Sequence, residues 1–446
     1  MLDLAVLATT LLAACVVVAV WPRSWIALII FLSLAAMPVA VPPIVGNAGW
    51  IALAVGAAFC LHRFDARRST DIPAAALIIA TTLFALWGLS NSNPPGDVFA
   101  DCKGILILGL ALFVFGRIAG TDLLVAALRG LAATLWFSFA CAVLSIVTGL
   151  SLTGRARDAS LFAEGDNTTD VVRLLTPSTH LATGVLAVSI GLWTLRPRLA
   201  AATIPYVIPA FGLAVLALSR NSILVIAIAL ILAPILNRNV RALIRAIIFM
   251  FCGVVAYFLA GWALTYLDDI RPFGQIRSIY NAYTGRVIEG MFGDQALRDK
   301  SLEYRRIEMD YLFRAISDYE MFGHGYGYSY KPPRDGRPIT AWFAHNYYLW
   351  TIVKTGMTGF LIHTVAYISP ISQALRRPLN PYRSACAAAA LALLAVSWAV
   401  PYAAAPESAV VLGALLGCAA AVGNPAAPSF RTVARNVSAH AVHRTF

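Results

Sequence analysis

A histidine and an asparagine stand where a polar stretch of the chain gives way to an apolar one. His345 and Asn346 are followed by "YYLWTIVKT" and then by Gly356-Met-Thr-Gly359. A histidine at such a boundary is reachable from water yet partly desolvated, which suits a general base near neutral pH. A single histidine at a membrane interface is more often structural, so the residue type alone does not establish a catalytic role.

The residues after His345 would form the helix that positions it. Asn346 is suited to cap that helix, because its side chain can accept from the first backbone N–H groups. Lys354 would lie two turns further along, where a cation at membrane depth indicates a functional role. Gly356 and Gly359 would let another helix approach closely.

Three arginines are candidates for binding an anion. The segment 301–320 predicts an amphipathic helix capped by Ser301, and at 100° per residue Arg305 falls within its apolar stripe. Arg220, in "LALSRNSILV", occupies a very short connection between two apolar runs, and Arg286 lies in "YTGRV". Because arginine keeps its charge, Arg305 and Arg220 must either bind an anion or extend to lipid headgroups.

A glycine-rich segment, "MFGHGYGYSYKPPRDGRP" at 321–338, precedes His345. Its glycines alternate with His324, Tyr326 and Tyr328, which indicates a close backbone approach with aromatic rings beside it. The segment lacks the strand and the lysine of a phosphate-binding loop. Packing and sugar binding both remain open, and so does the role of His324.

The composition predicts an all-α polytopic membrane protein that forms a single domain over 1–446. Of the 446 residues 59% are hydrophobic and 13% charged, against roughly 25% charged in a soluble domain. All spans should be helical, because lipid leaves open backbone groups unsatisfied. We expect 12 or 13 transmembrane helices from the apolar runs at 3–21, 25–41, 48–62, 72–91, 103–119, 125–149, 178–195, 199–218, 221–236, 243–264, 349–373, 383–402 and 407–423.

The net charge of +12 has an explanation that needs no nucleic acid. Most arginines fall in loops on one side of the predicted membrane, which is the positive-inside pattern. This pattern places the C-terminus in the cytoplasm, and the N-terminus outside if all thirteen spans exist. The "LAAC" at 12–15 is similar to a lipoprotein cleavage box, but the apolar run continues and no basic residue precedes it, so we expect an uncleaved helix.

The long connections all lie on the outer side, at 92–102, 151–177 and above all in a large loop at 267–344. This asymmetry favours a site facing outward. A transporter or flippase, the alternative from another class, would distribute its features over related halves, and no such repeat is found. Asp268-Asp269 is the nearest approach to a metal-binding or base pair of carboxylates, and we predict no metal.

The residues around His345 also resemble a known family. His345-Asn346, a nine-residue spacer and Gly356-x-x-Gly359 are similar to the His-Asn, spacer, Gly-x-x-Gly pattern of bacterial O-antigen ligases and polymerases. Ser301-Leu-Glu-Tyr-Arg305, the "GHGYG" turn and Ser219-Arg220 resemble further parts of that family. The specific matches are confined to 219–220 and 301–359, whereas the architecture resembles the family over the whole chain.

This resemblance implies an inverting, metal-independent glycosyltransferase of the inner membrane, with a glycosyltransferase C-like fold, no cofactor and a periplasmic site. The donor would be a glycan on polyprenyl (undecaprenyl) diphosphate. The acceptor would be a sugar hydroxyl of lipid A core in a ligase, or a second lipid-linked repeat in a polymerase. His345 would be the general base, and Arg220, Arg305 and Arg286 would bind the diphosphate. One departure is Pro177 and His180, where the family has an asparagine and a proline.

Overall fold

The computed structural model describes residues 22–41, 43–61, 65, 69–119, 121–150, 152, 174–266, 273–289, 300–331, 344–376 and 379–421. Within these ranges the regular secondary structure is helical, apart from one isolated bridge between Pro38 and Leu152. The prediction of an all-α polytopic membrane protein is therefore confirmed. The expected first helix at 3–21 lies outside the described residues, as do Asp268-Asp269 and most of 151–177.

The helices of the bundle match the apolar runs of the sequence. They are α2 (Pro22–Leu34), α3 (Pro43–Cys60), α4 (Asp71–Ser90), α5 (Pro95–Ile118), α6 (Leu123–Thr148), α8 (Pro177–Leu195), α9 (Ala200–Leu216), α10 (Arg220–Leu236), α11 (Val240–Tyr266), α15 (Tyr347–Ala374), α16 (Pro381–Val396) and α17 (Pro406–Ala420). Within the described ranges, six helices are long and apolar enough to cross a membrane by themselves. Several others, such as the 16-residue α16, would span only about 24 Å at 1.5 Å per residue.

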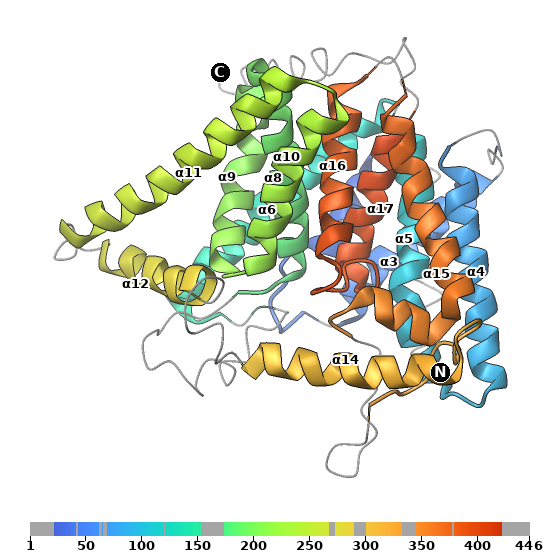
Figure 1. The fold of residues 1–446 in the computed structure, drawn as a ribbon. Coiled ribbons are helices and arrows are strands. Elements are labelled where there is room, and N and C mark those ends of the chain that lie inside the picture. Colours follow the sequence, from blue (N-terminus) through green and yellow to red (C-terminus); the bar gives the residue numbers. More distant parts are fainter. Residues whose placement is uncertain are drawn as a thin grey trace.

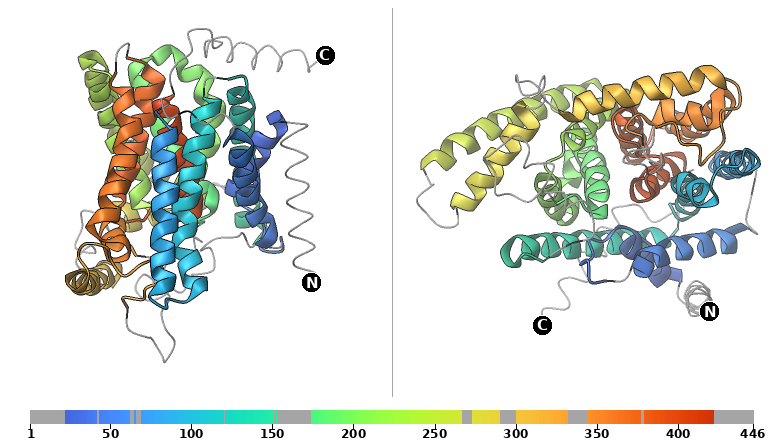
Figure 2. Two further views of the ribbon diagram at one scale, coloured as in Figure 1. Left: turned by 90° about the vertical axis from the view of Figure 1, so that its right-hand side faces the viewer. Right: turned by 90° about the horizontal axis from the view of Figure 1, so that it is seen from below.

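The helix ends gather at two opposite faces of the bundle (Figure 1). Helix α14 (Lys300–Asp318) lies across one face, which we call the α14 end, and α8, α10 and α15 begin there. Seen from this end, α14 runs along one edge of the bundle next to α15 (Figure 2). We call the opposite face the arginine-rich end, because it carries Arg117, Arg196, Arg198, Arg245 and Arg383.

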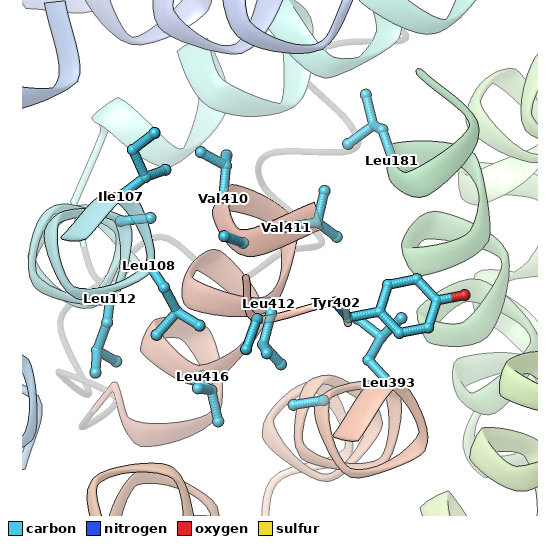
Figure 3. Close-up of a cluster of buried hydrophobic side chains, with 14 of the residues drawn as sticks. Ile107, Leu108, Leu112, Leu181, Leu393, Tyr402, Val410, Val411, Leu412 and Leu416 are labelled. Atoms are coloured by element: carbon cyan, nitrogen blue, oxygen red, sulfur yellow. The ribbon is translucent and has the colours of Figure 1, made fainter. Parts of the chain in front are cut away.

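The centre of the bundle is formed by α5 and α17, with α8 and α16 beside them (Figure 3). Leu108 and Leu112 of α5 pack there with Leu412 and Leu416 of α17, all fully buried. A Cβ at Gly413 would lie 2.5 Å from the Leu108 carbonyl oxygen. Small residues bring the two backbones together, as is typical of helix pairs in lipid.

Several boundaries differ from the sequence prediction, such as the end of α2 at Leu34 instead of 41, and two of the differences have a clear physical reason. Helix α5 begins at Pro95, eight residues before the predicted span, so most of the expected loop at 92–102 is helical. Asp101 interrupts the apolar run, but its charge is paired within the protein. Helix α16 ends at Val396 instead of reaching 402. There the chain turns, and its apolar residues, such as Tyr402 and Ala403, remain buried at the α14 end.

The large loop at 267–344 contains helices, as predicted, and its glycine-rich part after α14 is irregular. It contains α12 (Phe273–Tyr283), a π-helical turn (Thr284–Glu289) and α14. Helix α11 leads into it and leans away from the bundle (Figure 1). Its side chains, such as Phe258 and Trp262, are exposed and would face lipid.

Candidate active site

Helix α14 presents one polar and one buried face at its end of the bundle. Glu303 and Arg306 are exposed, whereas Leu312 is fully buried and Arg305 half-buried. The prediction that Arg305 lies on the inner side of this helix is confirmed. The helix begins at Lys300, so Ser301 lies in the first turn instead of preceding it.

Glu308 lies on the same helix and contacts His345 twice. Its Oε2 accepts from the His345 backbone N–H and is 2.8 Å from both that nitrogen and the ring Nδ1. The Glu308 side chain is 2% exposed, whereas that of His345 is 19% exposed. A buried carboxylate therefore holds a histidine that stays accessible from outside the protein.

Basic and aromatic groups surround the other oxygen of Glu308. The Lys331 ammonium group is 2.5 Å from Oε1, and the Tyr330 hydroxyl lies 3.5 Å from the same atom. Burial acts to raise the pKa of Glu308, but the hydrogen bonds from His345 and Lys331 outweigh it, so the pKa lies below its ordinary value. Glu308 is thus a carboxylate at neutral pH.

Tyr304 completes this group of side chains. Its ring lies edge-on to His345 with the centroids 5.9 Å apart, and its hydroxyl accepts from Lys331 at 3.3 Å. The Lys331 ammonium group lies over the Tyr304 ring, 5.5 Å from its centroid. The rotamers of His345 and Lys331 are therefore restricted by neighbours on both sides.

This arrangement determines what the imidazole can do. A neutral histidine that donates from Nδ1 to a carboxylate carries its lone pair on Nε2. The same carboxylate stabilises the imidazolium ion that forms when Nε2 accepts a proton. His345 and Glu308 thus have the geometry of a general base with its orienting carboxylate.

The start of α15 places His345 beside α14. The Asn346 side chain accepts from the N–H groups of Tyr348 and Leu349, both at 3.1 Å, so the predicted helix cap is confirmed. The Tyr347 N–H donates to the Ser397 carbonyl at 3.0 Å. The turn after α16 therefore anchors the residues that follow His345.

The glycine-rich segment is inserted between α4 and α15. The φ angles of Gly323, Gly325 and Gly327 are all positive, between 64° and 85°. A Cβ on Gly325 would meet the backbone of Gly88 in α4. Only glycine allows this combination of conformation and close approach, which explains the alternation seen in the sequence.

A break in α15 provides the hydrogen bonds for this insertion. Gly356 has a φ of 63° and a ψ of −174° inside the helix. The carbonyls of Val353 and Lys354 accept from His324 and Gly325, both at 2.9 Å. The Met357 N–H donates to a carbonyl of the same inserted segment, that of Glu320. Non-helical backbone at membrane depth is tolerated where protein satisfies it in this way.

The sequence assigned Gly356 and Gly359 to helix packing, and only Gly359 has that role. A Cβ on Gly359 would lie 2.9 Å from the Phe84 ring of α4. Gly356 instead allows the break in α15. Two glycines three residues apart therefore serve two different purposes.

Lys354 is fully buried and paired. Its ammonium group is 2.6 Å from Asp101 Oδ2 and 2.6 Å from the Tyr328 carbonyl oxygen. The same carboxylate oxygen accepts from the Gly327 N–H at 2.6 Å. The predicted cation at membrane depth thus ties α5, α15 and the glycine-rich segment together.

His324 and Tyr326 are packing residues of the inserted segment. His324 stacks on Tyr328 with the ring centroids 3.7 Å apart, and its Nε2 lies 2.9 Å from the Ala315 carbonyl oxygen of α14. Tyr326 is fully buried beside Trp350. His324 therefore supports α14 from the side of the bundle, and His345 is the more accessible of the two histidines.

The other predicted arginines lie on separate elements. Arg220 is the first residue of α10, after Ser219 as the capping residue, and is half-buried at the α14 end. Helix α10 packs on α16, which leads into the turn bonded to Tyr347. Arg286 falls in the π-helical turn, and its side chain lies outside the described residues. The structure thus brings His345 together with the α14 face that carries Arg305, with Arg220 at the same end.

Sequence reasoning did not identify Glu308, Lys331, Tyr304 or Asp101. Glu308 follows Arg305 by three residues, so it lies about 60° from it at the edge of the apolar stripe. A carboxylate on the inner edge of an amphipathic helix was therefore a usable signal. Asp101 and Lys331 gave no such signal in the sequence, because the residues they pair with are distant along the chain.

The fold and this site define a polytopic helical membrane protein with a histidine–carboxylate pair and basic side chains at one end. Residues 205–364 match the family model described as O-antigen ligase. This match includes Arg220, Arg305 and His345, and it confirms the resemblance inferred from the sequence. It supports a glycosyltransferase-type enzyme similar to the O-antigen ligases. No match was found among the curated proteins.

Proposed function

We propose that the protein is an O-antigen ligase-type glycosyltransferase. It transfers a glycan from polyprenyl diphosphate to a sugar hydroxyl of lipid A core, with inversion and without a metal ion. The observation that carries this proposal is the 2.8 Å contact between His345 Nδ1 and the buried Glu308 carboxylate at the α14 end of the bundle.

In this reaction His345 Nε2 takes the proton of the acceptor hydroxyl. The hydroxyl oxygen bonds to the anomeric carbon of the donor, from the face opposite the diphosphate. The bond between that carbon and the phosphate oxygen breaks, and polyprenyl diphosphate leaves with the electron pair. Glu308 stabilises the imidazolium ion throughout this step.

The leaving group needs positive charge near its phosphates. Arg305, Arg220 and Arg286 would supply it through charge-assisted hydrogen bonds, for which the planar guanidinium is well suited. A diphosphate is a weakly basic leaving group, so fixed cations in a partly desolvated site can stabilise the developing charge. Arg305 is supported most directly, since it lies one turn from Glu308 on the inner side of α14.

The positive-inside rule assigns the arginine-rich end to the cytoplasm. The α14 end would then face the periplasm, with the protein in the inner membrane. In this proposed orientation His345 would lie at the outer leaflet, where a lipid-linked glycan and lipid A core could both reach it.

The test is reconstitution of the purified protein with a polyprenyl-diphosphate-linked glycan and each of two acceptors. Transfer to lipid A core is expected, and His345→Ala should abolish it while donor affinity stays within a few fold, because the base acts only in the transition state. Extension of the glycan without transfer to lipid A core would identify a polymerase. Export of the intact donor without any transfer would identify a transporter.

The metal-independent character has its own test. Activity should persist in EDTA. Activity that is lost in EDTA and restored by Mg²⁺ would refute this part of the proposal and direct attention to Asp268-Asp269. Among the described residues, no group of three or more histidine, cysteine or acidic residues could hold a metal ion.

A further inference from the structure

A large cavity lies inside the bundle, away from His345 and Glu308. It has a volume of about 1070 Å³, is partly open to the surroundings and is lined by residues of α2, α5, α6, α8, α9, α11, α16 and α17. Ordinary ligand pockets hold roughly 300–1,000 Å³, so this space could accommodate far more than a simple ion. Its walls are mostly aliphatic, in contrast to the charged and aromatic side chains around His345.

The apolar walls extend from one end of the bundle toward the other. Leu34, Leu181 and Val410 belong to the half nearer the α14 end, and Leu195 and Cys418 to the half nearer the arginine-rich end. Val410, Val411 and Leu181 appear on facing helices in the close-up of the core (Figure 3). An elongated aliphatic space of this kind fits a hydrocarbon chain.

The charged residues of the cavity are all basic and all lie at its arginine-rich end. They are Arg196, Arg198, Arg245 and Arg383. The described lining contains no aspartate or glutamate, and no described carboxylate forms an ion pair with any of the four. Arg196 and Arg198 are exposed, whereas Arg245 and Arg383 are half-buried, so the positive charge continues from the surface into the cavity.

Two of these arginines also bind helix ends. Arg245 donates to the Thr194 carbonyl of α8 at 2.6 Å, and Arg383 donates to the Ala419 and Gln373 carbonyls at 3.0 and 2.5 Å. Helix C-termini carry only about half a negative charge each, and each guanidinium has five N–H donors. These bonds hold Arg245 and Arg383 in place and leave further N–H donors on each guanidinium group for a ligand. The positive-inside rule explains why arginines lie at this end, but it does not explain why they line a cavity.

We propose that this cavity binds one anionic phospholipid of the membrane leaflet at the arginine-rich end. The phosphate would contact Arg245 and Arg383 with Arg196 and Arg198 at the entrance, and an acyl chain would fill the aliphatic space. Charge complementarity selects an anionic headgroup, and the cavity's length and volume select a chain. This site is separate from the proposed transferase site and does not depend on that function.

The experiment uses the full chain in detergent, with lipid binding measured by native mass spectrometry. Phosphatidylglycerol and phosphatidylcholine with the same acyl chains are titrated. Phosphatidylglycerol should bind at least tenfold more tightly, and Arg245→Gln with Arg383→Gln should remove at least tenfold of its affinity. The matched control is Arg241→Gln with Arg376→Gln, which removes the same charge outside the cavity lining and should change affinity by less than twofold.

Two further variants test the contributions of the headgroup and of the acyl chain separately. They avoid Arg245 and Arg383, whose replacement could disturb the helix ends that these arginines bind. Arg196→Gln with Arg198→Gln, at exposed positions, should weaken phosphatidylglycerol binding at least threefold. Val188→Trp fills the aliphatic wall and should also weaken it, with the arginines intact. Thermal unfolding of each variant verifies that it is folded.

Several results would overturn the proposal. Equal affinity for the two lipids, or an equal loss in the control pair, would remove the role of the arginines. Competition by inorganic phosphate as effective as that by the lipid would reduce the site to a simple anion site. Preferential binding of polyprenyl phosphate would assign the cavity to the carrier lipid. No transfer reaction is measured, so failure here leaves the proposed transferase function untouched.

Discussion

The Lys354 ammonium group and the Asp101 carboxylate are 2.6 Å apart, although the residues are 253 positions apart in the chain. Each side chain is 1% exposed. The pair joins α15 to α5, and through the Gly327 N–H it also holds the glycine-rich segment that contacts α14. The support of the candidate site therefore depends on a buried ion pair between helices that are not neighbours in sequence.

Removing one partner of this pair should be costly, because it leaves a buried charge uncompensated. We expect Lys354→Met to lower the free energy of unfolding by about 3–5 kcal/mol, seen as a lower midpoint of thermal unfolding in detergent. Adding Asp101→Leu should recover most of this loss. Lys103→Met is the control with a small effect, because Lys103 lies in α5 near Asp101 but is half-buried and bonded to the neutral Asn47 side chain. An unchanged midpoint for Lys354→Met would contradict the pairing.

Glu308 should act by orienting His345. We expect Glu308→Gln to lower kcat by about 10²–10⁴-fold, as loss of an orienting carboxylate does, with little change in donor affinity. The measurement is steady-state transfer with a separate donor-binding assay. Glu303→Gln, on the exposed face of α14, should leave kcat unchanged. Loss of donor binding together with kcat in Glu308→Gln would indicate a structural role alone.

The lowered pKa of Glu308 predicts the pH dependence of its contribution to stability. A carboxylate whose pKa is lower in the folded protein stabilises the fold above its ordinary pKa of 4.5 and loses this contribution as the pH falls through the lowered value. The difference in unfolding midpoint between wild type and Glu308→Gln should therefore shrink as the pH falls below 4.5. A difference that grows as the pH falls below 4.5 would contradict this sign.

The inserted segment predicts which glycines tolerate a side chain. Gly356→Ala and Gly325→Ala should each destabilise the protein, by at least about 1–3 kcal/mol, because both residues have positive φ and touch another backbone. Gly253→Ala in α11 is the control, since a Cβ there meets nothing within 4 Å. It should be neutral or slightly stabilising, because alanine favours a helix. Equal effects at the three positions, by thermal unfolding, would refute the assignment.

Two neighbouring arginines of α14, one half-buried and one exposed, test the donor site. Arg305→Ala should weaken donor binding by about 10–100-fold, the equivalent of one charge-assisted hydrogen bond of about 1.5–3 kcal/mol. Arg306→Ala, on the exposed face, should change it by less than twofold. The measurement is direct binding of polyprenyl diphosphate. Unchanged affinity in Arg305→Ala would remove this residue from the proposed diphosphate site.

The sequence by itself determined the membrane class, nearly all the described spans, helix α14 with Arg305 on its inner side, and the Asn346 cap. These features depend on local physics: lipid selects long apolar runs, and a cap acts within one turn. Only the tertiary structure decided that α5 begins at Pro95 and that Gly356 breaks α15. It also paired His345 with Glu308 and Lys354 with Asp101. Each of these features depends on a residue from another part of the chain, whose charge or backbone groups stabilise a local irregularity. The sequence pattern around the irregularity does not indicate which residue that is.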